Sequence, residues 1–265
     1  MKFKNNFLLN YLKEAPLSLA IERCFECEIL SQQIFTHPVL DLGCGDGIFS
    51  YVLFDEPIDT GIDLNPKALE RAKKYAMHKD LISCSAEQIP KTYESFETIF
   101  SNSTLEHIQN IENVLREVKR LLAKDGHFYI TVPTEFFERY SIFNVLLNKL
   151  GMTKLSLRYR NFYNAFWRHY HAYPIDQWRE IFTQYGFKVN HFVNYCPKSI
   201  VMLEDLFTLT ALPCLLVKKI CNRWFIFNNL RSMMVKIYVK FLRIDFRMNH
   251  TLKKGGLVFF DLVKQ

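Results

Sequence analysis

The sequence lacks a hydrophobic run long enough to cross a membrane, and it lacks a pattern of paired cysteines. The uncharged run at 206–217 holds twelve residues, whereas a bilayer core requires about 20 apolar residues. Seven cysteines include a single C-x-x-C, Cys24 and Cys27, which helix packing explains better than a metal or redox role. Met1–Asn10 shows no apolar region followed by a small-residue cleavage site. We therefore expect a reduced, cytoplasmic protein.

Glycine is also scarce, with nine residues in 265, yet Gly43, Gly45 and Gly47 fall within five positions. They follow the apolar run Val39–Leu42, which is typical of a buried strand, and a helix is expected after them. Glycine adopts positive φ and lets bare backbone approach a ligand, and the amides that open a helix present a positive end. The pattern predicts a turn that holds a nucleotide-like cofactor, with Cys44 as a small filler.

Two acidic residues narrow the choice of cofactor. Asp63 ends the apolar run 58–62, sixteen residues after Gly47, where a carboxylate can accept both hydroxyls of a ribose. A dinucleotide fold uses G-x-G-x-x-G, but this turn has the pattern G-x-G-x-G with Asp41 ahead of it. That acid would oppose a pyrophosphate and suits a ligand with a sulfonium or ammonium group, which argues against NAD.

At this point the chain resembles the class I S-adenosylmethionine-dependent methyltransferases, whose first motif is similar to Val39–Gly47. Four further segments fit that family in order, so the resemblance covers roughly residues 36–134. Relatives usually have an acid before the alanine of the third strand's loop; this chain has Ser85, so the adenine amino group would meet Ser85, Glu87 or backbone. The resemblance implies S-adenosylmethionine as the cofactor and a binding site formed by Asp41, Gly43, Cys44, Gly45, Gly47, Asp63, Leu64, Ser85, Ala86, Glu87 and Asn102.

Strand and helix patterns alternate along the chain, which is typical of an α/β fold with a doubly wound, mainly parallel sheet and helices on both faces. The resemblance implies seven strands, with the last inserted antiparallel beside the fifth, and Gly126 ends the helix before the fifth strand. Apolar periodicity and end signals predict helices at 17–34, 66–77, 110–123 and 174–185, and strands at 187–195 and 257–263.

Two segments fall outside this alternation. We expect one methyltransferase domain, 1–265, in which the insertions 135–172 and 196–254 form helical caps. Ligands of open α/β sheets lie beyond the carboxyl ends of the strands, where such insertions can cover them. Both insertions are therefore candidates for binding the methyl acceptor.

Histidines are the candidate catalytic residues because they titrate near neutral pH. A base is needed only if the acceptor is a hydroxyl or an acidic carbon. His107 follows the loop at the methionine end, and His169 and His171 lie in the first insertion. Each also has a structural explanation, as a loop-packing or locally hydrogen-bonded residue. An H-x-H pair without a nearby acid does not favour a metal, so we predict none.

Positive charge is concentrated in the second half, where residues 135–265 hold 20 Lys and Arg against 8 Asp and Glu. Residues 218–247 form a basic, aromatic-rich segment, which suits a helix in an anionic membrane interface on the inner face of the membrane. A cap helix with solvated lysines explains the same pattern. Nucleic acid is disfavoured, because Asn102–Leu105 lacks the Asn-Pro-Pro-Tyr loop with which relatives hold an extruded base.

These patterns together predict O- or C-methylation of a small-molecule, sugar, glycan or lipid-linked acceptor, at or near a membrane surface. RNA or protein methylation is the first alternative, since the basic aromatic cluster 158–171 could stack a base. The second alternative is a non-catalytic binding subunit with a cofactor fold. The intact glycines, Asp41, Asp63 and Asn102 favour a competent cofactor site over that subunit.

Overall fold

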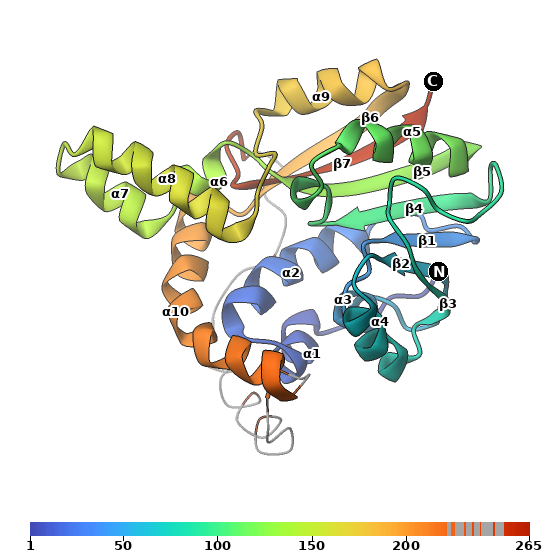
Figure 1. Cartoon of the computed structure of the whole chain (residues 1–265), viewed down its shortest axis with the longest axis horizontal. Helices are drawn as coiled ribbons and strands as arrows, with labels where there is room; N and C mark the ends of the chain where they lie inside the picture. The colour runs from blue at the N-terminus through green and yellow to red at the C-terminus, as the bar shows by residue number, and fades with distance from the viewer. Residues whose placement is uncertain (222–223, 226–230, 232–234, 236–238, 240–245, 247–251) are drawn as a thin grey trace.

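The computed structural model describes residues 1–221, 224–225, 231, 235, 239, 246 and 252–265 (Figure 1). A seven-stranded sheet with the order β3-β2-β1-β4-β5-β7-β6 forms the centre of the molecule. The strands are β1 Val39–Leu42, β2 Ile58–Asp63, β3 His78–Ser83, β4 Phe96–Asn102, β5 Leu122–Pro133, β6 Phe187–Tyr195 and β7 Leu257–Lys264. The first five pair in parallel, and β7 lies antiparallel between β5 and β6. The predicted doubly wound α/β fold is confirmed.

Helices cover both faces of this sheet (Figure 1). Side chains of alternate strand residues point to opposite faces, so Phe100 and Phe259 pack in one core cluster while Ile99 and Phe260 pack in the other. The first cluster includes residues of α1 Phe7–Glu14, α2 Leu17–Leu30 and α3 Ile48–Leu53; the second includes residues of α5 Ile111–Leu121 and α9 Ile175–Gln184. The sheet therefore lies between two layers of helices (Figure 1).

The predicted helix at 66–77 is shorter in the structure. Asn65 accepts a hydrogen bond from the Lys67 amide at 3.1 Å, and Pro66 takes the first helical position, so α4 starts as predicted. It ends at Ala72, because a short 3₁₀ turn and the left-handed Ala76 lead directly into β3. The predicted helix at 17–34 likewise ends at Leu30 as α2.

Gly126 does not end a helix, and the prediction of a helix stop there is wrong. α5 ends at Leu121, since Leu122 is already extended with φ −71° and ψ 133°. Gly126 lies inside β5 and is not among the glycines with positive φ. A Cβ at this position would lie 2.7 Å from the carbonyl oxygen of Glu97. The glycine is needed because β5 approaches β4 closely there.

Both insertions are helical where they are described. The first holds α6 Phe136–Arg139, α7 Ile142–Lys149 and α8 Thr153–Trp167, and α7 and α8 form an arm that projects from the body (Figure 1). The second begins with α10 Lys198–Cys221, which packs against α2. Most of the basic segment predicted at 218–247 lies outside the described residues. Among the described helices none is long and apolar enough to cross a membrane alone. The two parts of α10, Lys198–Thr208 and Pro213–Cys221, are bent by 62° relative to each other, and only taken together have they the length and apolar composition of a membrane span.

Replacing Gly126 by Ala is expected to lower the free energy of unfolding by about 1–3 kcal/mol, because the added methyl group would force β5 away from β4. Urea denaturation measures this change. Gly126→Asn should cost at least as much, whereas a helix-stop role would let Asn replace Gly with little loss. The control is Gly151→Asn, since Gly151 has φ +71° and open space around it. A neutral Gly126→Asn would contradict the packing explanation.

Candidate functional site

The glycine turn after β1 is held tightly on two sides and is open on the third. The amides of Gly43 and Cys44 both donate to the Ile62 carbonyl at 2.9 Å, which ties the turn to β2. A Cβ at Gly43 would lie 2.3 Å from Cγ2 of Thr104, whereas nothing lies within 4 Å of a Cβ at Gly45. All three glycines of the turn have positive φ, between 55° and 80°. The backbone at Gly45 therefore borders open space, as a ligand cradle requires.

Asp63 lies where β2 ends and faces this turn. Its Oδ2 accepts the Gly45 amide at 2.9 Å, and its Oδ1 accepts the Asn65 amide at 2.7 Å. Burial raises the pKa of Asp63 above its ordinary value, although these two amides oppose the change. Each carboxylate oxygen keeps a further lone pair for a ligand hydroxyl. Leu64 beside it is 75% exposed, so an apolar side chain is presented at the cleft.

The turn and Asp63 form one wall of a cleft of about 460 Å³. The loop after β3 and the loop after β4 form the other wall. The residues that line the cleft are Gly43, Ile62, Asp63, Leu64, Cys84, Ser85, Ala86, Glu87, Thr104, His107, Ile108, Gln109, Asn110 and Tyr170. Ser85 accepts the Glu87 amide at 3.2 Å, and Glu87 accepts the Asn113 side chain at 2.9 Å. None of these lining residues is a Lys or Arg, so no side chain here would neutralise a pyrophosphate.

Five of the predicted cofactor residues do not line the cleft, namely Asp41, Cys44, Gly45, Gly47 and Asn102, and the polar side chains of Asp41 and Asn102 are bonded within the protein. Asp41 is buried, and its Oδ2 accepts Ser50 Oγ at 2.5 Å and His78 Nε2 at 2.9 Å. Asn102 donates to Glu26 Oε2 at 2.7 Å and accepts Thr131 Oγ1 at 3.0 Å. The structure therefore assigns both residues to support of the turn and of the loop after β4. Direct pairing of Asp41 with a ligand cation, as the sequence suggested, does not fit this geometry.

S-adenosylmethionine fits the remaining groups. The open backbone at Gly45 suits the methionine part, the Asp63 carboxylate suits the ribose hydroxyls, and Leu64 with Ile108 suits the flat adenine. Cys44 is buried, and burial raises the pKa of its thiol well above the ordinary value, so it acts as a filler in the turn. Gly47 supports the close approach of α4, because a Cβ there would lie 2.9 Å from the Ala72 backbone.

A second cavity of about 230 Å³ adjoins the cleft, and His107 lines both. Its walls come from α2, the short helix Leu105–His107, the arm helix α8 and α10. Aromatic and aliphatic side chains form much of its surface, namely Phe137, Tyr163, Trp167, Val201, Leu215 and Trp224. The two insertions therefore close a cavity at the carboxyl ends of the strands, where the sequence predicted acceptor binding.

The floor of this cavity carries buried charge that the sequence analysis missed. Arg23 donates to both oxygens of Glu26, at 2.8 and 2.7 Å, and lies 3.0 Å from Glu22. Burial raises the pKa of Glu22 to about 7, with Arg23 opposing, and raises that of Glu106 to about 8. Burial also raises the pKa of Glu204. One sequence signal was available, because Glu26 lies between the apolar residues Phe25 and Cys27 of α2. The structure buries Glu26 fully.

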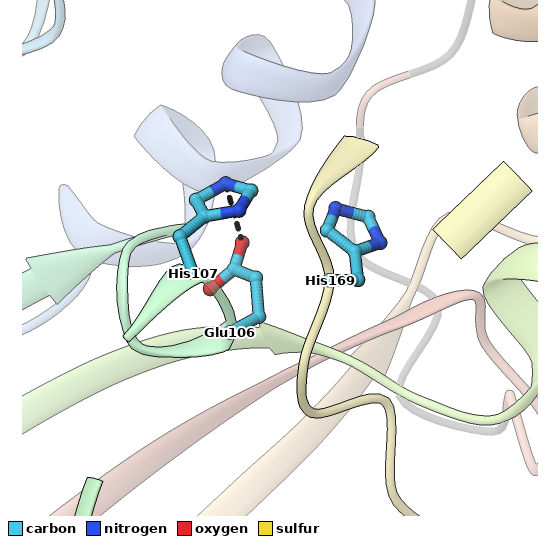
Figure 2. A group of neighbouring side chains, drawn as sticks. All are labelled: Glu106, His107 and His169. Carbon is cyan, nitrogen blue, oxygen red and sulfur yellow. Dashed lines mark ion pairs between the residues drawn. The ribbon is translucent and has the colours of Figure 1, made fainter. Parts of the chain in front are cut away.

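The structure separates the three candidate histidines. His107 and His169 lie together, with ring centroids 5.2 Å apart and Glu106 beside them (Figure 2). Burial lowers the pKa of His107, and burial with the neighbouring His107 lowers that of His169 to about 3. His171 lines neither cavity. Its Nδ1 contacts the Tyr173 hydroxyl at 2.7 Å, and its Nε2 contacts the Ile108 carbonyl at 2.8 Å. His171 therefore has a local hydrogen-bonding role, which was the alternative to a catalytic one.

The sheet order, the glycine turn and the carboxylate of Asp63 at the end of β2 are those of a class I S-adenosylmethionine-dependent methyltransferase. A family model described as a methyltransferase domain matches residues 11–191, and the chain belongs to this family. A solved structure described as an S-adenosylmethionine-dependent methyltransferase, possible histamine N-methyltransferase, from Thermotoga maritima has the same fold. Its TM-score is 0.57 at 16% identity, and the match covers 98% of this chain and 92% of that one.

Curated relatives match part of the chain. A ubiquinone biosynthesis O-methyltransferase from Glaesserella parasuis serovar 5 (strain SH0165) is 31% identical over 119 residues, which is 41% of this chain and 50% of the relative. A malonyl-acyl-carrier-protein O-methyltransferase from Legionella pneumophila is 30% identical over 108 residues, 38% of each chain. The chain spans about half the length of the curated relatives that it matches.

Replacing Asp63 by Ala is expected to weaken S-adenosylhomocysteine binding about 100-fold, because hydrogen bonds to a charged group contribute about 1.5–3 kcal/mol each. Isothermal titration calorimetry measures the affinity, and circular dichroism checks that the fold is kept. The matched control is Asp59→Ala, near the other end of β2, where the carboxylate pairs with Lys79 outside the cleft.

The same carboxylate sets the pH dependence of binding. Because the pKa of Asp63 is raised, affinity should fall on acidification from a higher pH than for an ordinary Asp, and Asp63→Asn should lose this dependence. Unchanged affinity in Asp63→Ala would remove this residue from the site.

Proposed function

We propose that this protein transfers the methyl group of S-adenosylmethionine to a hydroxyl of a small molecule bound in the second cavity. The observation that carries the proposal is the position of His107, which lines both the cofactor cleft and the cavity. A methyl donor in the cleft and an acceptor in the cavity would therefore meet beside this residue. The names of the two relatives given above, both O-methyltransferases, support an oxygen acceptor.

The chain's contribution to this reaction is positioning and removal of a proton. S-adenosylmethionine supplies a methyl group that its sulfonium already activates. Phe137, Tyr163 and Trp167 would hold the apolar body of the acceptor and exclude water. In-line alignment of two reactants removes a large part of the barrier. His107 offers a ring nitrogen where a hydroxyl must lose its proton, whereas His169, with a pKa lowered to about 3, would be too weak a base for that step.

Replacing Trp167 by Ala is expected to reduce methyl transfer at least tenfold through a higher KM for the acceptor, because it removes one wall of the cavity. S-adenosylmethionine with a radiolabelled methyl group is incubated with separate small-molecule, lipid, RNA and protein fractions of a cell extract. Label should enter the small-molecule or lipid fraction. The affinity for S-adenosylhomocysteine should be unchanged in the variant, since Trp167 does not line the cleft.

The control is Ile34→Ala, an exposed residue before β1 that lines neither cavity. Label in RNA or protein alone would favour the corresponding alternative function. No label in any fraction, together with tight cofactor binding, would favour a non-catalytic binding protein.

We further propose that the acceptor reaches the cavity from an anionic membrane surface, to which the arm of α7 and α8 binds. Residues 142–168 contain five Lys or Arg and no Asp or Glu. The arm also exposes large apolar side chains, among them Phe143, Leu146, Leu150, Leu157, Phe162 and Phe166, each at least 49% exposed. Apolar and basic residues on one helical element are typical of an interfacial site.

The position of the arm supports this route. Tyr163 and Trp167 of α8 line the acceptor cavity, and Leu215 of α10 does so on the neighbouring wall. α10 also exposes Leu216 and Ile220. A lipid-linked acceptor would pass from the interface into the cavity along these two elements. The protein would then be a peripheral protein on the cytoplasmic face of its membrane.

The double variant Leu150→Glu with Phe162→Glu is expected to lose most of its sedimentation with vesicles of phosphatidylglycerol and phosphatidylcholine at low salt. Two apolar anchors become negative charges that the anionic surface repels. Ile34→Glu is the control, because it adds a charge at an exposed apolar residue that is not on the arm. If the unaltered protein does not sediment at low salt, or the double variant sediments equally, the arm is not a membrane site.

A further inference from the structure

Glu106, His107 and His169 each bring one ligand atom to a common point, and these three atoms lie within 4.8 Å of one another. Glu106 and His107 come from the short helix after β4, and His169 comes from the loop after α8 (Figure 2). We infer that this cluster binds a divalent transition-metal ion between the cofactor cleft and the acceptor cavity. The prediction of no metal considered His169 with His171, whereas the structure pairs His169 with His107 and adds the missing acid.

The hydrogen bonds of His107 prepare it as a ligand. Its Nδ1 lies 3.1 Å from the carbonyl oxygen of Arg168, and a carbonyl can only accept, so Nδ1 carries the proton. Nε2 is then unprotonated, and it points to Glu106 at 3.7 Å, which is too long for a hydrogen bond. Metal-binding imidazoles commonly donate their second N–H to a carbonyl or carboxylate in this way.

The other two residues have atoms that nothing in the described structure satisfies. Glu106 is 2% exposed, and its Oε2 has no hydrogen-bond partner among the described residues. Nδ1 of His169 is also buried and has no hydrogen-bond partner among the described residues. Buried polar groups are rarely left unpaired in folded proteins, because each loses its bonds to water. A metal ion at this point would accept lone pairs from the Glu106 carboxylate and the His169 imidazole, which have no other partner among the described residues.

The charges around the cluster permit a cation. Arg23 is the cationic side chain among the residues that line the cavity, and it is paired with Glu22 at 3.0 Å and with Glu26 at 2.7 Å. Glu204 and Asp205 line the same cavity. Carboxyl groups therefore outnumber the one guanidinium among the described residues that line the cavity, and that guanidinium is paired, so a cation would meet no unpaired positive side chain there.

The ligand set selects the kind of metal. Two imidazoles and one carboxylate suit Zn²⁺, Fe²⁺, Co²⁺ or Mn²⁺, whereas Ca²⁺ and Mg²⁺ prefer all-oxygen sites. Three protein ligands leave positions open for other ligands. Since His107 and His169 both line the acceptor cavity, the open positions would be reached from it. The metal's catalytic role, which rests on the proposed function, is to bind the acceptor hydroxyl.

The chemical step is balanced without any oxidant or reductant. A hydroxyl oxygen bound to the metal would have a lowered pKa and would release its proton to solvent, because the histidine nitrogens would then be metal ligands and no longer bases. That oxygen then forms a bond to the methyl carbon while the carbon–sulfur bond breaks, and the bonding pair stays on sulfur as a thioether. The metal keeps its oxidation state. The products are the methyl ether, S-adenosylhomocysteine and one proton.

The test uses untagged full-length protein that has been treated with a chelator and then titrated with Zn²⁺ by calorimetry and with Co²⁺ by visible absorption. One Zn²⁺ per chain is expected, and the Co²⁺ complex should show the d–d bands of a site with nitrogen ligands. His169→Ala and Glu106→Gln should each weaken Zn²⁺ binding at least tenfold. The control is His191→Ala, which removes a histidine 3.3 Å from Asp261, outside both cavities.

Absence of stoichiometric Zn²⁺ and Co²⁺ binding, or equal affinity in His169→Ala and the unaltered protein, would overturn the metal site. Methyl transfer is measured separately after chelation and after Zn²⁺ or Mn²⁺ is restored. Transfer that persists fully in protein without metal would overturn the catalytic role of the metal and leave the proposed function standing. Stoichiometric metal binding that depends on His169, without transfer to any fraction, would support the site and count against the proposed function.

Discussion

One buried carboxylate, that of Glu26, holds the catalytic end of the molecule together. It accepts two hydrogen bonds from Arg23 and one each from Asn102, Ser103 and Tyr195, at 2.7 to 3.2 Å. These donors come from α2, from the end of β4 and its loop, and from the end of β6. A buried charge is tolerated only when hydrogen bonds of this kind replace the bonds that it would make to water. The loop that carries Glu106 and His107 is therefore fixed relative to α2 by a polar network and by packing.

The parts of the site that follow from sequence are those in which neighbouring residues carry the whole signal. The glycines at 43, 45 and 47 and the carboxylate of Asp63 were predicted because strand-turn-helix units have local rules of φ and spacing. The mainly parallel sheet followed from the alternation of strand and helix patterns, and the antiparallel β7 was implied by the family resemblance. Gly126 was misassigned because a glycine near the end of a helix has two explanations, and only the distance to the Glu97 carbonyl separates them.

The acceptor cavity was not predictable in this way, because its groups meet only in the folded chain. Glu22 and Arg23 look like ordinary charged positions of an amphipathic helix, and Glu204 lies 182 and 181 positions further along the chain. His169 and His171 are two residues apart, yet the first lines the cavity and the second bonds to Ile108 and Tyr173. In an irregular loop, spacing does not fix the direction of a side chain, so sequence could name both histidines but not choose between them.

An ion pair ties α10 of the second insertion to the cofactor turn. Lys218 of α10 donates to Asp46, the acid between Gly45 and Gly47, at 2.6 Å, and its ammonium lies 4.0 Å from the ring centre of Trp224. Trp224 lines the acceptor cavity. A wall of the cavity is thus anchored on the turn that would hold the methyl donor, so displacement of the turn by a bound cofactor would be passed to that wall. Lys218, which the sequence placed in the basic segment, is accordingly a structural cation that is paired with Asp46.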